Sequence, residues 1–228
     1  MDIIYYDNNI IVAIKPAGVI STDEPGGMPS LLRQALGNEN ADIRTVHRLD
    51  QVVSGLMVFA QNPETASELS RQIRAGEFKK TYLAVVRGVP QERKGRMEDI
   101  LLRSKEQRKT FVVNKPCRGS QEAVLDYRLL GSNGELSMVE INLVTGRTHQ
   151  IRAHLAYLGH PVLGDIKYGN RKMNERTGTK TQALCAVRIS FLDVPEENTL
   201  HYLSGKVIKL KDPQILQQFD ALDKSKNV

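Results

Sequence analysis

The sequence predicts an α+β fold built on a mixed, largely antiparallel sheet. Two segments, 3–14 and 123–144, each have the pattern of two strands around a hairpin turn, at Asp7-Asn8-Asn9 and at Ser132-Asn133-Gly134. Only a few helical segments lie between the predicted strands. Strands paired in hairpins with interspersed helices are typical of α+β proteins.

The first sixty residues are predicted to form strands at 3–6 and 10–14, a short helix at 30–36 and a strand at 56–60. Lys15-Pro16-Ala17-Gly18 ends the second of these strands, because proline and glycine interrupt regular pairing. The apolar run at 56–60 suits a buried central strand behind a turn opened by Ser54-Gly55.

A longer helix is predicted to begin at Asn62, a capping residue followed by Pro63 in the first turn, and to end at Gly76. Its buried stripe is predicted to be Ala66, Leu69 and Ile73.

The remaining elements are a strand at 81–86, a basic stretch at 91–120 and a helix at 146–160. Strand alternation places Tyr82 on the same face as Ala84 and Val86. The basic stretch has few apolar residues, so it is expected to be an excursion over the surface. The residues of the last helix that are expected to face the core are Ile151, Leu155 and Leu158.

Composition indicates one globular catalytic domain over residues 1–228, because the chain has 228 residues and an apolar content of 40%. The sequence has no apolar run near the ~20 residues of a membrane helix and no basic signal peptide, so a cytoplasmic protein, monomeric by default, is expected. Its two cysteines have no spacing partner, its five histidines form no HExxH pattern, and no metal site is expected.

The net charge of +6 is modest evidence for a polyanionic partner such as RNA. The basic residues gather in two places, around the end of the predicted helix at 63–75 and above all in the stretch 91–120. Any one of these side chains, taken alone, is expected to be ordinary solvated surface charge.

Two segments carry the side chains that point to chemistry. The first is His47-Arg48-Leu49-Asp50, which places an acid and an arginine just before a buried strand, where loops fixed by rigid elements collect catalytic groups. The second is the segment 146–152, with sequence GRTHQIR, which supplies matching positive charge through Arg147 and Arg152.

With the segments Lys79-Lys80-Thr81-Tyr82 and 159–165 (GHPVLGD), these motifs resemble the large-subunit rRNA pseudouridine synthase A family, in order and in approximate spacing. The resemblance implies the pseudouridine synthase fold, in which helices and loops around the sheet frame a catalytic cleft. It implies isomerisation of a uridine in rRNA or tRNA, without a cofactor. Many relatives carry an accessory RNA-binding domain before the catalytic one, and a first strand at Ile3 predicts that it is absent here.

The resemblance also assigns catalytic roles. Asp50 is the expected catalytic carboxylate, acting on the sugar carbon C1′ as nucleophile or as base. Arg152 matches the position that pairs with this carboxylate, and such a cation typically lowers an acid's pKa by roughly 1 to 3 units. Tyr82 matches the active-site tyrosine, whose ring can stack on uracil and whose phenol can help to remove the C5 proton.

Four further residues are expected to bind substrate. Arg48 either fills the space that a flipped base leaves or contacts phosphate, and His47 is expected to position the turn by hydrogen bonding. Leu184 matches a position that packs against the base, although a plain core role is equally consistent, and Arg147 supplies positive charge.

The chain departs from the family pattern in two places. Gln51-Val52-Val53 replaces a basic residue and a threonine after the aspartate, and Cys185 replaces a histidine. The first change affects phosphate contacts or substrate choice and not the reaction. The second removes one imidazole and leaves the role of the backbone intact. One alternative is an RNA-binding protein that has kept the fold and lost the chemistry. Another is a glycoside or nucleoside hydrolase, which normally needs two carboxylates, and the motifs supply no second acid.

Overall fold

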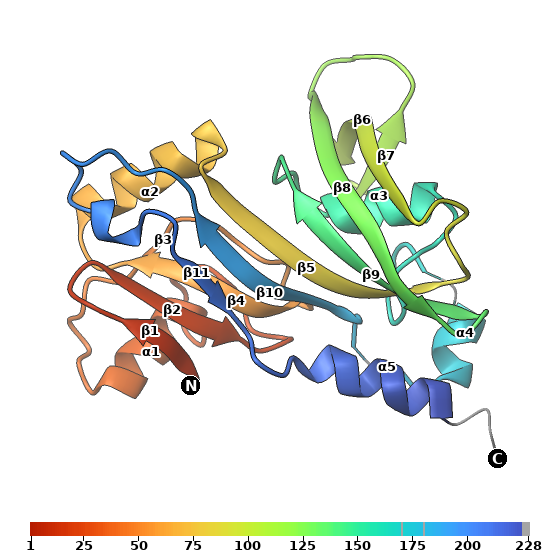
Figure 1. Cartoon of the computed structure of the whole chain (residues 1–228), viewed down its shortest axis with the longest axis horizontal. Coiled ribbons are helices and arrows are strands. Elements are labelled where there is room, and N and C mark those ends of the chain that lie inside the picture. The colour runs from red at the N-terminus through yellow and green to blue at the C-terminus, as the bar shows by residue number, and fades with distance from the viewer. Residues whose placement is uncertain (170, 180, 225–228) are drawn as a thin grey trace. The chain divides into compact units, whose positions relative to one another are not determined.

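The computed structural model describes residues 1–169, 171–179 and 181–224 (Figure 1). Its contacts divide the chain into two compact units. The first unit consists of Met1–Lys80 and Ala186–Leu210, and the second consists of the described residues of Thr81–Cys185 and Lys211–Val228. Each unit is discontinuous in sequence, and the expectation of one catalytic domain with a cleft stays a prediction.

The strands of the first unit are β1 (Ile3–Tyr6), β2 (Ile10–Lys15), β3 (Arg44–Thr45), β4 (Ser54–Ala60), β10 (Leu184–Phe191) from Ala186 onward, and β11 (Val207–Lys209). β1, β2, β4 and β10 are neighbours in that order. The pairs β1–β2, β2–β4, β3–β4 and β10–β11 are antiparallel, with Ile11 opposite Phe59. β4 begins two residues earlier than predicted, so that Ser54 and Gly55 belong to the strand and not to the turn before it.

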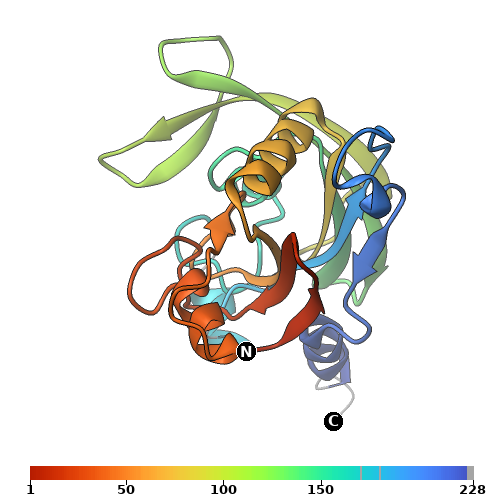
Figure 2. The ribbon, with the colours of Figure 1, turned by 90° about the vertical axis from the view of Figure 1, so that its left-hand side faces the viewer.

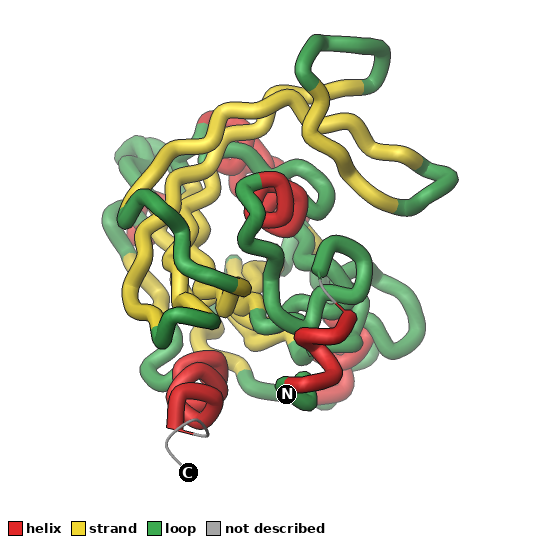
Figure 3. The backbone as a smooth tube through the Cα atoms, turned by 90° about the vertical axis from the view of Figure 1, so that its right-hand side faces the viewer, coloured by secondary structure: helices red, strands yellow, loops and turns green. Residues whose placement is uncertain are grey.

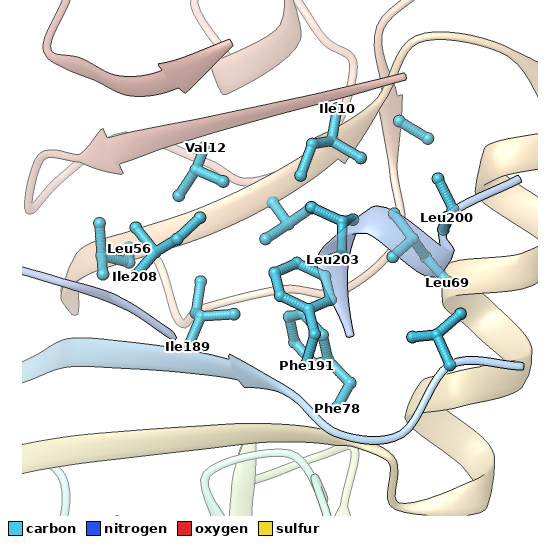
Figure 4. Packing of buried hydrophobic residues seen from close by; sticks show 13 residues of the cluster. Ile10, Val12, Leu56, Leu69, Phe78, Ile189, Phe191, Leu200, Leu203 and Ile208 are labelled. Atoms are coloured by element: carbon cyan, nitrogen blue, oxygen red, sulfur yellow. The ribbon is translucent and has the colours of Figure 1, made fainter. Parts of the chain in front are cut away.

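The core of the first unit lies between this sheet and helix α2 (Pro63–Ala75), as Figure 4 shows. Leu69 of α2 is fully buried against the strands, and the rings of Phe78 and Phe191 meet edge to face with centroids 5.3 Å apart. Ala66 and Ile73 pack against the same cluster, which confirms the predicted stripe. Burial of such apolar side chains is the main source of stability for the unit.

The ends of the helices in the first unit follow from capping. The Asn62 side chain accepts a hydrogen bond from the Thr65 amide at 2.8 Å, and Gly76 ends α2 in the left-handed conformation with φ 73°. The short helix α1 (Met28–Leu36) begins two residues before the prediction, because Pro29 suits the first turn. The 3₁₀ turn η1 (His201–Leu203) completes the unit.

The strands of the second unit are β5 (Phe78–Arg87) from Thr81 onward, β6 (Lys94–Ser104), β7 (Lys109–Val113), β8 (Ser120–Ser132) and β9 (Leu136–Leu143). They are neighbours in the order β5, β9, β8, β6, β7, and the pairs β6–β7, β6–β8 and β8–β9 are antiparallel. The predicted turn after Ser132 is present, with Asn133 Oδ1 accepting the Leu136 amide at 2.8 Å. The α+β class with a largely antiparallel sheet is therefore confirmed.

The stretch 91–120 is not the irregular excursion that its composition suggests. It forms all of β6 and all of β7, and the turns that join β6 to β7 and β7 to β8 extend away from the rest of the second unit (Figures 2 and 3). Pairing with β8 supplies the backbone hydrogen bonds, so that few apolar side chains are needed. Leu101 is buried with Ala123 and Ala153, and this contact anchors the hairpin to the unit.

Helix α3 (Gln150–Tyr157) is shorter than the predicted helix, because His149 takes a left-handed conformation with φ 57°. Ile151 and Leu155 are buried as predicted. Leu158 is 37% exposed, so the expectation that it faces the core is wrong; it lies just beyond the last helical turn. Helices α4 (Arg171–Arg176) and α5 (Gln214–Lys224) follow later in the chain.

Candidate active site

The turn that carries Asp50 is fixed through the backbone of the residue before it. The Ser21 hydroxyl donates to the Leu49 carbonyl at 2.8 Å and accepts the Leu49 amide at 3.1 Å. The Asp50 carbonyl accepts the Val53 amide at 3.0 Å, which closes the turn into β4. These bonds fix the half-buried Asp50 through the backbone, while the neighbouring Arg48 is exposed.

A cation that the sequence motifs do not reveal lies close to Asp50 within the first unit. The Lys15 side chain is 0% exposed, and its ammonium group donates to the carbonyls of Pro16, Val19 and Gln51 at 2.8, 2.7 and 2.9 Å. Burial lowers the pKa of Lys15 to about 8, while the nearby charge of Asp50 acts to raise it. Three carbonyl acceptors fix this ammonium beside the turn.

His47 ties the same turn to the sheet as a neutral imidazole. Its Nε2 accepts the Val58 amide of β4 at 3.0 Å, so its proton resides on Nδ1. Burial, together with the charge of Lys80, lowers the pKa of His47 well below its ordinary value. The structure thus contains a positioning hydrogen bond of the expected kind, and a role of His47 in substrate binding stays a prediction.

Gly55 permits the close packing that follows the turn. A Cβ at this position, where φ is +120°, would collide with the backbone of Ala186 in β10. The glycine is therefore required for β4 and β10 to approach each other immediately behind the Asp50 turn.

In the second unit, Tyr82 lies on β5 and is almost completely buried, at 4% exposure. The adjacent Thr81 hydroxyl donates to Asn142 Oδ1 of β9 at 2.8 Å, which fixes the start of this part of the strand. On the preceding segment, burial lowers the pKa of Lys80 to about 8.

Arg152 projects from α3 into a closely packed environment and is 3% exposed. Its Nε lies 2.7 Å from Asp165 Oδ2, and its Nη2 lies 3.1 Å from Asp165 Oδ1. Asp165 is 0% exposed, so this is a buried, side-on, two-bond ion pair. With its carboxamide oxygen turned toward the guanidinium, Gln182 accepts from Nη2 at 2.9 Å and from Nε at 3.2 Å.

The sequence motifs do not identify Asp165 as a partner of Arg152, although Gly164-Asp165 ends one of them. The expected ion pair between Arg152 and Asp50 stays a prediction, because the two side chains belong to different units. His47, Arg48 and Asp50 lie together in the first unit, and the other predicted site residues lie in the second: Tyr82, Arg147, Arg152 and Leu184.

The remaining predicted residues have simple environments. Leu184 is buried, and Cys185 beside it is also buried, as expected for a small core residue. Arg147 is half-buried and donates through Nε to the Glu122 carbonyl at 2.8 Å. Among the described residues no cluster of histidine, cysteine and acidic side chains has the geometry to hold a metal ion. In the same part of the chain no helix is long and apolar enough to cross a membrane.

Comparisons with known proteins agree with the two motif regions. A family model described as RNA pseudouridylate synthase matches residues 9–157. YhcT of Bacillus subtilis, named an uncharacterized RNA pseudouridine synthase, is 36% identical over 177 residues, which are 74% of this chain and 58% of that protein. The ribosomal large subunit pseudouridine synthase D of Borreliella burgdorferi is 37% identical over 180 residues, which are 73% of this chain and 54% of that protein. This chain thus spans little more than half the length of these relatives.

A tRNA pseudouridine synthase C of Haemophilus ducreyi is matched over most of its length, with 33% identity over 213 residues that are 84% of this chain and 85% of that protein. Two solved structures share the fold. Human RNA Pseudouridylate Synthase Domain Containing 4 superposes with a TM-score of 0.75 at 23% identity, covering 97% of this chain and 92% of that one. Human RNA Pseudouridylate Synthase Domain Containing 1 superposes with a TM-score of 0.71 at 25% identity, covering 97% of this chain and 94% of that one. From the matched motifs, the family model and these relatives, the chain belongs to the RNA pseudouridylate synthase family.

Proposed function

We propose that this protein isomerises a specific uridine of rRNA or tRNA to pseudouridine, with Asp50 as the catalytic carboxylate. The observation that carries the proposal is the fixed Asp50 turn, clamped by Ser21 and adjacent to the buried ammonium of Lys15. Relatives named for large-subunit ribosomal RNA and for tRNA support both substrate classes.

The reaction breaks the bond between C1′ and N1, turns the uracil, and joins C1′ to C5. The C5 proton is lost and N1 gains one, so the product is an isomer and no cofactor is required. An ionised carboxylate beside C1′ can act as nucleophile or as base in the first step. Lys15 places a buried positive charge close to this carboxylate.

We assign the second cation to Arg152. We propose that the guanidinium of Arg152, which is held by Asp165 and Gln182, pairs with Asp50 as the motif match implies. In this arrangement Asp165 compensates the charge of the buried arginine.

Tyr82 and Leu184 are proposed to hold the uracil, because both are buried in the second unit and offer a ring face and an aliphatic surface. Arg48 is exposed next to Asp50, which suits an arginine that fills the space of a flipped base or contacts phosphate.

The β6–β7 hairpin is proposed to contact the RNA backbone. Its exposed basic side chains outnumber the acidic ones, and backbone contacts of this kind position an RNA without reading its sequence. The exposed basic residues in and next to this hairpin are Arg93, Lys94, Arg96, Arg103, Lys105, Arg108, Lys115 and Arg118.

The test is to express the wild type, Asp50→Ala and Asp42→Ala in cells that lack synthases of this family, and to map pseudouridine by carbodiimide primer-extension stops. Asp42 is an exposed aspartate of the same unit and pairs with Arg44 at the surface, so its variant controls for loss of an acid. We expect a site that appears with the wild type and Asp42→Ala and is absent with Asp50→Ala. No new site with the wild type would favour the catalytically silent RNA-binding protein.

A further inference from the structure

The guanidinium of Arg152 is held within the second unit by more than an ion pair. The Tyr168 ring lies with its centroid 5.0 Å from Arg152 Cζ. Asp165 Oδ1, which binds Nη2, also accepts the backbone amides of Lys167 and Tyr168 at 2.8 and 3.0 Å. One carboxylate therefore binds the arginine and also fixes the backbone that carries the stacked ring.

The Tyr168 hydroxyl joins this cluster to its neighbours on β7 and α3. It accepts the Thr110 amide at 2.6 Å and lies 2.9 Å from His149 Nδ1. An amide can only donate, so the hydroxyl accepts from Thr110 and is able to donate its own proton to His149. The Thr110 hydroxyl donates to the Thr148 carbonyl at 2.9 Å, which binds β7 directly to the start of α3.

Strand β7 meets the same ring through Lys109. Lys109 Nζ lies 4.9 Å from the Tyr168 centroid, so two cations, Lys109 and Arg152, contact one aromatic side chain. Tyr168 thus connects the hairpin that we propose to contact RNA with the arginine that we propose to face the catalytic carboxylate. The sequence alone assigns Tyr168 no role.

We propose that Asp165 and Tyr168 are positioning residues that hold the guanidinium of Arg152 in the orientation in which it serves the catalytic carboxylate. The inference rests on the proposed function of Arg152 and deepens it. Arginine has a long side chain with several rotatable bonds, and a catalytic cation is effective only when its geometry is set before the reaction. The ion pair holds the edge of the guanidinium, and the Tyr168 ring packs against it.

The experiment compares Tyr168→Leu, Tyr168→Phe and the control Tyr127→Leu in single-turnover kinetics with a purified RNA substrate and in thermal unfolding. Tyr127 is a buried tyrosine of the second unit, whereas Tyr168 is half-buried, and the Tyr127 ring lies against Gly95. Tyr168→Leu removes the ring and is expected to lower the single-turnover rate roughly ten- to hundred-fold, with KM within about two-fold, because small misplacements of a catalytic group have effects of this size.

Tyr168→Phe keeps the ring and removes the hydroxyl that accepts the Thr110 amide. It is expected to lower the unfolding temperature and to keep the rate within about three-fold of the wild type, because the contact of the ring with Arg152 is retained. Tyr127→Leu is expected to lower the unfolding temperature and to leave the rate within about two-fold. If Tyr168 had a purely structural role, the single-turnover rate would not change separately from the unfolding temperature in this way.

The inference would be overturned by equal rates of Tyr168→Leu and Tyr127→Leu, or by a change in KM alone in Tyr168→Leu. If Tyr168→Leu does not fold, Asp165→Asn takes its place, since it removes the carboxylate charge that binds Nε and Nη2, and it is expected to lower the rate with KM unchanged. A normal rate in that variant would also overturn the inference. An inactive wild type, by contrast, would overturn the proposed function itself.

Discussion

Replacement of His47 by glutamine tests how the Asp50 turn is held, through the acid sensitivity of the fold. His47 is neutral in the folded protein, because burial lowers its pKa well below the ordinary value of 6.5. In the unfolded chain it binds a proton as the pH falls through that value. The unfolded state therefore binds more protons below about pH 6.5, and the stability contributed by neutral His47 is lost as the pH falls.

The size of the effect follows from linkage. At about pH 5, roughly 1.5 units below its pKa, the histidine is protonated in the unfolded chain. This proton binding stabilises the unfolded state and so lowers the free energy of unfolding by about 2 kcal/mol relative to pH 7. Glutamine can present an oxygen where Nε2 accepts the Val58 amide, and it does not titrate in this range. His47→Gln should therefore lose about 2 kcal/mol less stability than the wild type between pH 7 and pH 5.

The assay is urea unfolding at several pH values, with His201→Gln as the control variant of an exposed histidine. The buried His154, whose pKa burial also lowers, contributes equally to the wild type and to both variants. The control should retain the full loss of stability in acid. If His47→Gln and the wild type lose the same stability between pH 7 and pH 5, His47 is not the neutral buried group described here.

Three further predictions follow from the packing and charge of the two units. Arg152→Ala should abolish activity and lower the free energy of unfolding by about 3 to 5 kcal/mol, because it leaves the buried Asp165 without its partner, and an unchanged unfolding midpoint in urea would contradict this. Leu69→Ala should cost about 2 to 5 kcal/mol in the same assay, against less than about 0.5 for the exposed Leu192→Ala. Alanine at Arg103 and Lys105 together should weaken RNA binding and reduce the slope of log K against log salt by about 0.7 to 0.9 for each phosphate that is no longer neutralised; an unchanged slope would remove the hairpin from the interface.

The elements that the sequence predicts well are those whose signals are local. The cap at Asn62, the stop at Gly76 and the stripe through Leu69 define α2 without reference to the rest of the chain. The Ser132-Asn133-Gly134 turn likewise fixes the β8–β9 hairpin through its own side chains.

The strands β6 and β7 escape prediction because β6 is stabilised by pairing with β8, which lies further along the chain, and β7 by pairing with β6. The sequence of a polar strand that is held in a sheet by hydrogen bonds lacks the alternation of apolar and polar residues from which strands are predicted. The predicted helical position of Leu158 fails for a simpler reason, since α3 ends at Tyr157.

The motifs identify the side chains expected to act in the reaction but not their supports. In the sequence Lys15 indicates only the end of a strand, although its ammonium is fixed beside Asp50 by three carbonyls. Asp165 and Tyr168 are similarly hidden, because their contacts with Arg152 depend on how α3 and the following loop pack. Such partners are set by tertiary structure, and spacing along the sequence does not encode them.

The central claim is that Asp50 carries out the isomerisation, and loss of the C5 hydrogen of uridine tests it most directly. Purified wild type and Asp50→Asn would be incubated with rRNA and tRNA labelled with tritium at C5 of uridine, with folding checked by thermal unfolding and RNA affinity by filter binding. We predict tritium release by the wild type and none above background by Asp50→Asn, with fold and affinity retained. Equal release by both proteins would contradict the assignment of Asp50.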